Sequence, residues 1–305
     1  MYRHHNQNHH SHQGHHHQRH DTRLDRGSPS LVEVTLLGGF AVTIDGVTTA
    51  DRGWSRRSAA ALVKILALAP GHRLHRERVM DLLWPDESPV RSAPRLHKAA
   101  YFARRAAGRD DAVVLRDDLV WLFPDADVTV DAVRFEQLAR EAVAQCDPGL
   151  AKQALGWYGG ELLPADLYED WATDRRELLH LRRLDVLGLI GEWRELAELD
   201  PTNEEAHVQL MQRHVAAGDG EAALLQYQHL ERVLERELGA EPGEAARRAR
   251  LDASRLDRQD LDLRPARVDN LLAELAELAD RQHAVLAQLA AVGSTPRVPE
   301  PLQGC

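Results

Sequence analysis

The segment SAPRLHKAAYFARRAAG, residues 92–108, decides the expected fold around it. Successive residues of an α-helix turn by about 100°, so a helix here separates small apolar residues from cations and aromatic rings. The packing side holds Leu96, Ala100, Ala103 and Ala107. The opposite side holds Lys98, Tyr101, Phe102 and Arg105, with Arg91, Arg95 and Arg104 towards the edges. Ser92 is the expected N-cap and Gly108 the end of the helix.

Two further helices are expected before this one. Ser55 can cap the segment SRRSAAALVKILALA, which runs to the stop signal Pro70-Gly71. The segment HRERVMDLLW, residues 75–84, has an apolar stripe and ends at a proline. The polar loop PDESPVR, residues 85–91, joins it to the third helix.

Short strands are expected on both sides of the helices. Apolar residues alternate over 32–36 and 40–44, with turns at Gly38-Gly39 and Asp45-Gly46. The segment AVVLRDDLVWLF, residues 112–123, reads as a hairpin. Sheet, three helices and hairpin form the order of a winged helix of the response-regulator output type, whose last helix enters the DNA major groove.

The charge distribution agrees with this reading. The chain has 305 residues, 38 Lys and Arg, 48 Asp and Glu, and a net charge of −10. Residues 52–109, however, hold 13 Lys and Arg and four acidic residues, a balance of +9, which leaves −19 for the remainder. A basic module is therefore expected to be joined to an acidic one.

The basic segment supplies the candidate DNA contacts. Arginine and lysine can reach phosphates or guanine edges, and aromatic carbons can contact a thymine methyl group. The starting residues of the first helix and one hairpin residue are candidate phosphate contacts. The full set of DNA-binding candidates is Arg56, Arg57, Arg91, Arg95, Lys98, Tyr101, Phe102, Arg104, Arg105 and Arg116. The alternative is a solvated basic helix with one aromatic ring tucked into the core.

The acidic half is expected to be helical. VTVDAVRFEQLAREAVAQC reads as a short strand and a helix, and Asp147-Pro148 opens a longer helical series. Residues 203–217 and 220–237 have the small and large positions of one tetratricopeptide unit. The pattern is carried by Ala206, Leu210, Ala217, Gly218, Ala222 and Tyr227. Such helix pairs leave a concave surface for another protein.

Three motifs carry a resemblance to a known family: LHKAAYFARRAAG, WYGGELLPADLYEDWATDRR and NEEAHVQLMQRHVAAGDGEAALLQYQHLERVLERELGAEPG. With the layout over residues 31–250, they resemble bacterial activators of the antibiotic-regulatory-protein (SARP) type, a winged helix fused to a bacterial transcriptional activation domain. The resemblance implies promoter-repeat binding and recruitment of RNA polymerase through the wing, the loop at 85–91 and the helical domain. Relatives often append an ATPase module, but this chain has no G-x-x-x-x-G-K-[ST] motif. Small alanines in the reading helix leave the DNA sequence preference undetermined.

The C-terminal segment lies outside that resemblance. Apolar residues alternate spacings of three and four, the pattern of a coiled-coil seam with one polar position at Gln282. The seam positions are Val268, Leu271, Leu275, Leu278, Val285, Leu289 and Val292. Two copies could associate through this seam, or the helix could fold back onto the helical domain.

The expected fold class is therefore mainly α: an N-terminal α+β winged helix, an all-α tetratricopeptide-like domain and a C-terminal helix. The expected boundaries are a disordered His-rich arm (1–30), the winged helix (31–124), the activation domain (125–252), the C-terminal helix (253–293) and a flexible tail (294–305).

Other function classes find little support in the sequence. Two cysteines cannot build a disulfide framework or a four-thiolate zinc site, and their scarcity suits a cytoplasmic location. The sequence has no catalytic signature, so neither an enzyme, a cofactor nor a metal site is expected. No membrane partner is expected, because no apolar run approaches 18 residues. A protein scaffold that does not rely on DNA is the remaining alternative.

Overall fold

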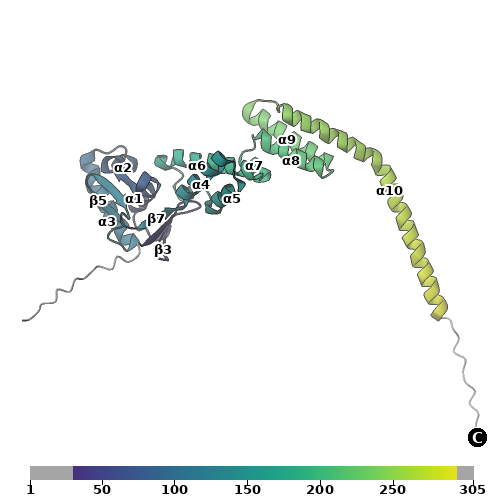
Figure 1. The fold of residues 1–305 in the computed structure, drawn as a ribbon, viewed down its shortest axis with the longest axis horizontal. Coiled ribbons are helices and arrows are strands. Elements are labelled where there is room, and N and C mark those ends of the chain that lie inside the picture. The colour runs from purple at the N-terminus through teal and green to yellow at the C-terminus, as the bar shows by residue number, and fades with distance from the viewer. Residues whose placement is uncertain (1–29, 294–305) are drawn as a thin grey trace, which may run out of the picture. The chain divides into compact units, whose positions relative to one another are not determined.

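The computed structural model describes residues 30–293, and the side chains within 30–258 and 267–289. The expected fold class is confirmed: a mixed N-terminal part is followed by helices alone (Figure 1). Contacts divide the chain into two units. The first comprises residues 30–35 and Phe40–Val130, and the second comprises Leu36–Gly39 and the chain from Asp131. The His-rich arm up to residue 29 and the tail at 294–305 lie outside the described residues.

The first unit begins with a four-stranded sheet. Its strands are β1 (Leu31–Thr35), β2 (Ala41–Ile44), β3 (Val47–Ala50) and β7 (Asp127–Val130), in the order β3-β2-β1-β7. The Asp45-Gly46 turn joins β2 to a third strand, which the sequence reading did not include. β7 pairs in parallel with β1. The sheet therefore extends the first unit to Val130, beyond the expected boundary at residue 124.

Three helices and a second sheet complete the unit. The helices are α1 (Arg57–Leu68), α2 (Arg76–Leu83) and α3 (Pro89–Ala107), with short 3-10 helices at Asp51–Gly53 and Pro70–His72. The second sheet is formed by β4 (Arg73–His75), β5 (Val113–Arg116) and β6 (Leu119–Leu122), in the order β4-β6-β5. The β5-β6 hairpin is the expected wing. Leu62, Leu66, Leu96 and Leu122 are among the buried side chains, and such burial stabilises a fold by about 1.5–3 kcal/mol per side chain.

Three local expectations in this unit were wrong. The N-cap of α1 is Arg56 rather than Ser55, and its side chain makes no capping hydrogen bond. Residues 73–75 form a strand, because Leu74 pairs with Val120 of β6, so α2 begins only at Arg76. The third error concerns the start of α3, where Ser88 rather than Ser92 is the N-cap.

The second unit consists of seven α-helices within the described residues. They are α4 (Asp131–Gln145), α5 (Pro148–Trp157), α6 (Asp170–Ile190), α7 (Trp193–Leu199), α8 (Glu204–Ala216), α9 (Gly220–Leu238) and α10 (Glu244–Gly293), with a 3-10 helix at Pro164–Asp166. α8 and α9 form the expected tetratricopeptide-like pair, and α10 packs against both. Ala246, Ala249 and Ala253 of α10 are buried there, so the C-terminal helix begins inside the helical domain rather than at residue 253.

The segment Leu36–Gly39 is held within the second unit by backbone contacts. Gly38 N–H donates to the carbonyl of Glu161 at 2.8 Å, and Leu163 N–H donates to that of Leu36 at 2.9 Å. Gly38 has φ +82°, and a Cβ there would lie 2.6 Å from the carbonyl oxygen of Gly159. Only glycine fits such a close backbone approach without a shift. Gly159 and Gly160, the Gly-Gly pair in WYGGELLP, lie on the other side of this contact, where a Cβ would come within 2.9 Å of the backbone of Leu37 or Gly38. The pair thus has a packing role.

Asp131 is the side-chain anchor of this segment. Its carboxylate accepts hydrogen bonds from the backbone N–H groups of Leu36, at 2.8 and 3.0 Å, and Leu37, at 2.9 Å. It also accepts one from Ala132 at the start of α4, at 2.7 Å. Burial raises the pKa of Asp131, and the three backbone donors oppose that rise.

His207 is a buried polar group of the tetratricopeptide-like pair. Its Nε2 lies 3.1 Å from the carbonyl oxygen of Pro201, and its Nδ1 lies 2.6 Å from the side-chain nitrogen of Gln226. One ring nitrogen thus donates and the other accepts, as in a neutral imidazole. Burial, and then the neighbouring His229 with ring centroids 5.7 Å apart, lower the pKa of His207.

We expect this burial to make the helical unit sensitive to mild acid. The folded state binds the proton less readily than the unfolded chain, so the contribution is complete above the unfolded pKa of about 6.5. It is lost as the pH falls from there towards the lowered pKa of the folded state. Thermal unfolding between pH 7.5 and 5 should show a falling midpoint, and His207→Gln should flatten that slope. His283→Gln, on the exposed part of α10, is the control. Equal slopes in all three proteins would contradict the prediction.

Candidate nucleic-acid interface

The outward face of α3 carries Lys98, Tyr101 and Arg105, all exposed. The Tyr101 ring is 48% exposed. The opposite side, with Leu96, Ala99, Ala100 and Ala103, is buried against the rest of the first unit. The division of the two faces therefore follows the sequence expectation, except at Phe102.

Phe102 does not belong to the outward face. Its side chain is half-buried and makes an edge contact with Tyr101, with ring centroids 5.3 Å apart. The guanidinium of Arg56 lies 5.1 Å from the centre of the Phe102 ring, within the range of a cation-π contact. Phe102 therefore supports Tyr101 and Arg56 rather than facing outward.

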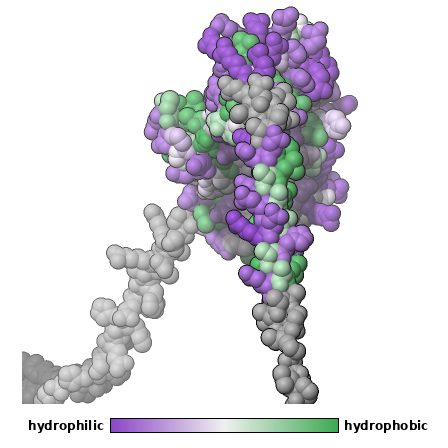
Figure 2. Space-filling model, turned by 90° about the vertical axis from the view of Figure 1, so that its right-hand side faces the viewer, coloured by the Kyte–Doolittle hydropathy of each residue, from purple (hydrophilic) through white to green (hydrophobic). Residues whose placement is uncertain are grey.

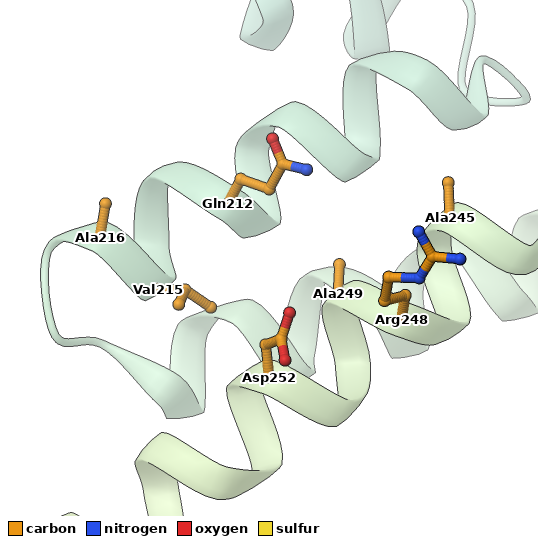
Figure 3. A pocket seen from close by; sticks show the side chains of 7 residues that line it. All are labelled: Gln212, Val215, Ala216, Ala245, Arg248, Ala249 and Asp252. Carbon is orange, nitrogen blue, oxygen red and sulfur yellow. The ribbon is translucent and has the colours of Figure 1, made fainter.

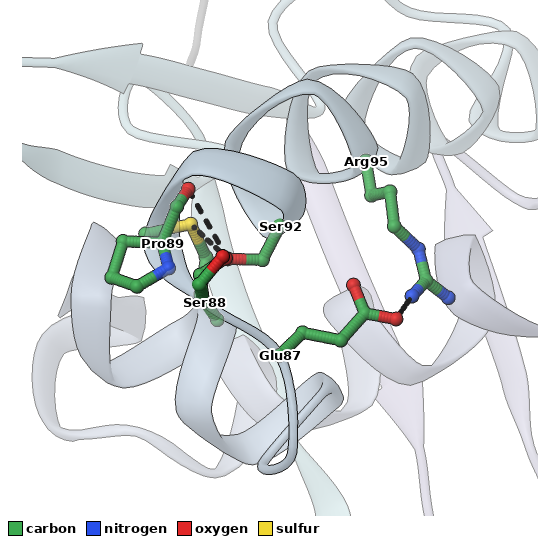
Figure 4. Close-up of polar contacts among 6 residues, drawn as sticks. Glu87, Ser88, Pro89, Ser92 and Arg95 are labelled. Carbon is green, nitrogen blue, oxygen red and sulfur yellow. Dashed lines mark hydrogen bonds and ion pairs between the residues drawn. The ribbon is translucent and has the colours of Figure 1, made fainter.

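Arg95 lies on the same flank and already has partners. Its guanidinium is 4.5 Å from the centre of the Trp84 ring and forms an ion pair with Glu87 (Figure 4). The side chain is 47% exposed, so the pair remains open to solvent. Exposed ion pairs contribute about 0–1 kcal/mol, so an incoming phosphate could compete with Glu87.

Arg104 lies on the opposite flank, next to the wing. It donates a hydrogen bond to the carbonyl oxygen of Val113 on β5 at 2.9 Å. This bond ties α3 to the wing hairpin. Arg104 is therefore a structural contact in this unit.

The start of α3 differs from the sequence expectation. Ser88 is the N-cap and Pro89 the first helical residue, so the helix takes in part of the expected loop at 85–91. Ser92 is buried instead of capping. Its hydroxyl lies 3.2 Å from the sulfur of Met80 and within 3.4 Å of the carbonyl oxygens of Ser88 and Pro89 (Figure 4).

The remaining candidates are exposed around α3. Arg91 lies in the first turn of α3, and Arg56 and Arg57 lie at the start of α1. Arg116 lies on the wing, where its side chain is 3.6 Å from the carboxylate of Asp117. Arg76 and His97 line a pocket beside the wing and were not among the sequence candidates. Arg76 is the first residue of α2, and only the pairing of β4 with β6 brings it beside the wing.

The second unit presents an apolar stripe on the distal part of α10. Val268, Leu271, Leu275, Leu278, Val285 and Leu289 are between 53% and 63% exposed. Leu272 and Leu286 are exposed as well. In Figure 2, green and purple residues alternate along the column that ends in the right-hand of the two grey traces. Val292 lies where side chains are not described.

A groove lies between α8 and α10 (Figure 3). Its volume is about 260 Å³, and its lining includes Val215, Ala216 and Ala249. Arg248 and Asp252 provide charged groups at its edge. The small side chains leave an apolar depression of the size of one large side chain.

Among the side chains that the structure describes within residues 30–293, no cluster of histidine, cysteine and carboxylate groups could hold a metal ion. None of the helices in that range is long and apolar enough to cross a membrane.

Comparisons with known proteins assign the helical half. Residues 130–254 match the family described as the bacterial transcriptional activator domain. Among solved structures, the chain is similar to Mycobacterium tuberculosis EmbR in complex with a low affinity phosphopeptide, with 19% sequence identity and a TM-score of 0.54. The match covers 75% of this chain and 66% of the EmbR chain, so this chain spans just under two thirds of that relative. A comparison with curated proteins gave no match.

The described chain thus carries a bacterial transcriptional activator domain at residues 130–254, after a unit with the element order of a winged helix, as the resemblance noted in the sequence implies.

Proposed function

We propose that the protein is a sequence-specific DNA-binding activator that binds promoter repeats and recruits RNA polymerase. The outward face of α3, with exposed Lys98, Tyr101 and Arg105, carries this proposal. A helix with side chains is about 10–12 Å wide, and the major groove is about 12 Å wide, so this face meets base edges. A cytoplasmic, nucleoid-associated location follows from such a function.

The flanks of the same helix account for the other cations. When a helix fills the major groove, its two flanks point towards the phosphate backbones. One flank carries Arg95, and Arg56 at the start of α1 lies against the Phe102 ring on that side. The other flank is bonded to the wing, which carries Arg116. Phosphate contacts of this kind position the protein, while the outward face distinguishes the bases.

A salt titration with the full-length protein tests DNA binding. Duplexes selected from a pool with a randomised centre should bind more tightly than duplexes of unrelated sequence. The logarithm of the binding constant should fall linearly with that of the salt concentration, because phosphate contacts release counterions. In vitro transcription from a fragment that carries the selected site should rise when the protein is added. Absence of DNA affinity at low salt would contradict the proposal and favour the scaffold alternative.

The contacts with polymerase are proposed for the wing, the α2-α3 loop and the helical domain. The loop is shorter than the sequence suggested, and Val90 at the start of α3 is 84% exposed. In the helical domain, the α8-α10 groove offers an apolar depression with charged edges. An apolar centre with a polar rim is the usual composition of a protein–protein interface.

A second copy of this chain is the proposed occupant of the apolar stripe on α10. Six of the eight large apolar side chains that are exposed there repeat at coiled-coil spacing. α10 is continuous, and its distal side chains are exposed rather than folded back onto the helical domain. A patch of this length would be costly to leave in water.

Light scattering before and after removal of the chain from about residue 262 checks the dimer. We expect the mass of the full-length protein to be that of two chains and the truncated protein to be a monomer. Leu278→Arg in the full-length chain should have the same effect, because it introduces a charge into the seam while the helix is retained. Asn270→Arg, off the seam positions, is the matched control. An unchanged mass after truncation would rule out self-association through α10.

A further inference from the structure

Beside the wing, the structure forms a pocket that the sequence did not suggest. We propose that this pocket, the wing notch, binds one phosphate of the DNA backbone, and that Asp117 and Asp118 hold its two arginines when no DNA is bound. The wing notch is defined by Arg76, His97, Arg116, Asp117 and Asp118, over a floor that includes Leu115. The inference rests on the proposed DNA-binding function and adds a specific anion site to it.

The sheet brings the two arginines to the same end of the wing. β4 runs antiparallel to β6, with His75 opposite Leu119, so the residue after β4 lies beside the wing turn. Arg76 is that residue, and its backbone N–H donates to the carbonyl of Asp118 at 2.8 Å. Arg116 is the last residue of β5, immediately before the turn. The volume of the notch is about 320 Å³, enough room for a phosphate group.

The carboxylates hold the arginines only loosely. Arg76 lies 3.6 Å from the carboxylate of Asp118, and Arg116 lies at the same distance from that of Asp117. The carboxylates are 69% and 86% exposed, respectively. Such exposed pairs contribute about 0–1 kcal/mol. A phosphate, which accepts charge-assisted hydrogen bonds from two guanidinium groups at once, can displace them.

The position of the notch matches the path of a DNA strand. His97 and Arg104 lie two turns apart on the wing side of α3, and Arg104 is bonded to β5. This flank adjoins the outward face of Lys98 and Tyr101. A duplex with its major groove on that face therefore brings one backbone to the wing side, where His97, Arg76 and Arg116 meet it.

The wing turn allows a charge change without a change of conformation. Asp117 and Asp118 have φ values of +52° and +59°, in the left-handed region. Asparagine also tolerates this region, and it has the same shape as aspartate. Asp118→Asn therefore removes the competing charge and leaves the turn intact.

Fluorescence anisotropy of the full-length protein with a 30-base-pair duplex of mixed sequence, over a series of KCl concentrations, tests the notch. Asp118→Asn should tighten binding about threefold to tenfold, because it removes a charge close to a phosphate. Arg76→Ala should weaken binding. It should also make the negative slope of log K against log salt shallower by about 0.9, the loss of one phosphate contact. Asp110→Asn and Arg78→Ala, which make the same charge changes at exposed sites outside the notch, are the matched controls.

The two variants have opposite expected signs, which separates phosphate binding from a structural role. If Arg76 only anchored the wing through Asp118, both substitutions would weaken binding, and the salt slope would stay unchanged. That result, or equal effects of the controls, would overturn the wing notch while DNA binding stood. If the unmodified protein bound no duplex at low salt, the proposed function itself would fail.

Discussion

Simultaneous replacement of Lys98 and Arg105 by alanine is expected to lower the affinity for a selected duplex by about 2–4 kcal/mol, or roughly thirtyfold to a thousandfold. Both side chains lie exposed on the outward face of α3, so their truncation leaves the core of the first unit untouched. Contacts with base edges distinguish sequences, so the preference for the selected duplex over unrelated DNA should also shrink. Competition binding with the two duplexes measures both effects.

Asp219→Ala is the control for this pair. Asp219 caps α9 by accepting a hydrogen bond from Ala222 N–H at 2.9 Å, and loss of such a cap costs about 1 kcal/mol of stability. DNA affinity should be unchanged, because Asp219 lies in the second unit. An equal loss of affinity in the double variant and in Asp219→Ala would indicate misfolding rather than lost contacts.

Asp131→Ala is expected to lower the free energy of unfolding of the second unit by about 3 kcal/mol. The substitution leaves three backbone N–H groups, those of Leu36, Leu37 and Ala132, without their acceptor in a partly buried place. An unsatisfied donor of this kind costs about 1–3 kcal/mol. Because the three lost bonds share one carboxylate, we expect a total near the upper end of that range rather than three times it. Urea unfolding followed by circular dichroism provides the measurement.

Asp131→Asn refines that experiment. Its amide oxygen can accept from part of the set, but its NH₂ group faces backbone donors, so an intermediate loss is expected. Asp174→Ala, at an exposed position on α6, is the matched control. A loss at Asp131 no larger than that at Asp174 would show that the contacts with Leu36 and Leu37 contribute little.

The sequence predicted the elements that have long or strongly periodic patterns. The apolar side of α3 and the wing hairpin follow from local spacing, and so does the tetratricopeptide-like pair. β4 was missed because its three residues carry no period of their own: Leu74 is a strand residue only because β6 offers a partner. The start of α3 was misplaced because Ser92 has the composition of a cap but is buried beside Met80.

The candidate interface shows the same division between local and tertiary information. The exposure of Lys98 and Arg105 follows from helical geometry alone. The partners of Arg95, by contrast, lie in the segment before α3, and the partner of Arg104 lies on β5. The wing notch depends on three elements that meet, so no local motif could reveal it.

The interleaving of the two units has a consequence for how such genes can be rearranged. Residues Leu36–Gly39 belong to the second unit but are encoded within the first. An exchange at the codon for Asp131 would deliver the helices without the peptide that Asp131 and Gly160 hold. The family match begins at residue 130 and leaves this peptide out. Recombinants that keep residues 36–39 with their own helices should therefore survive selection more often than those that cut between the two units.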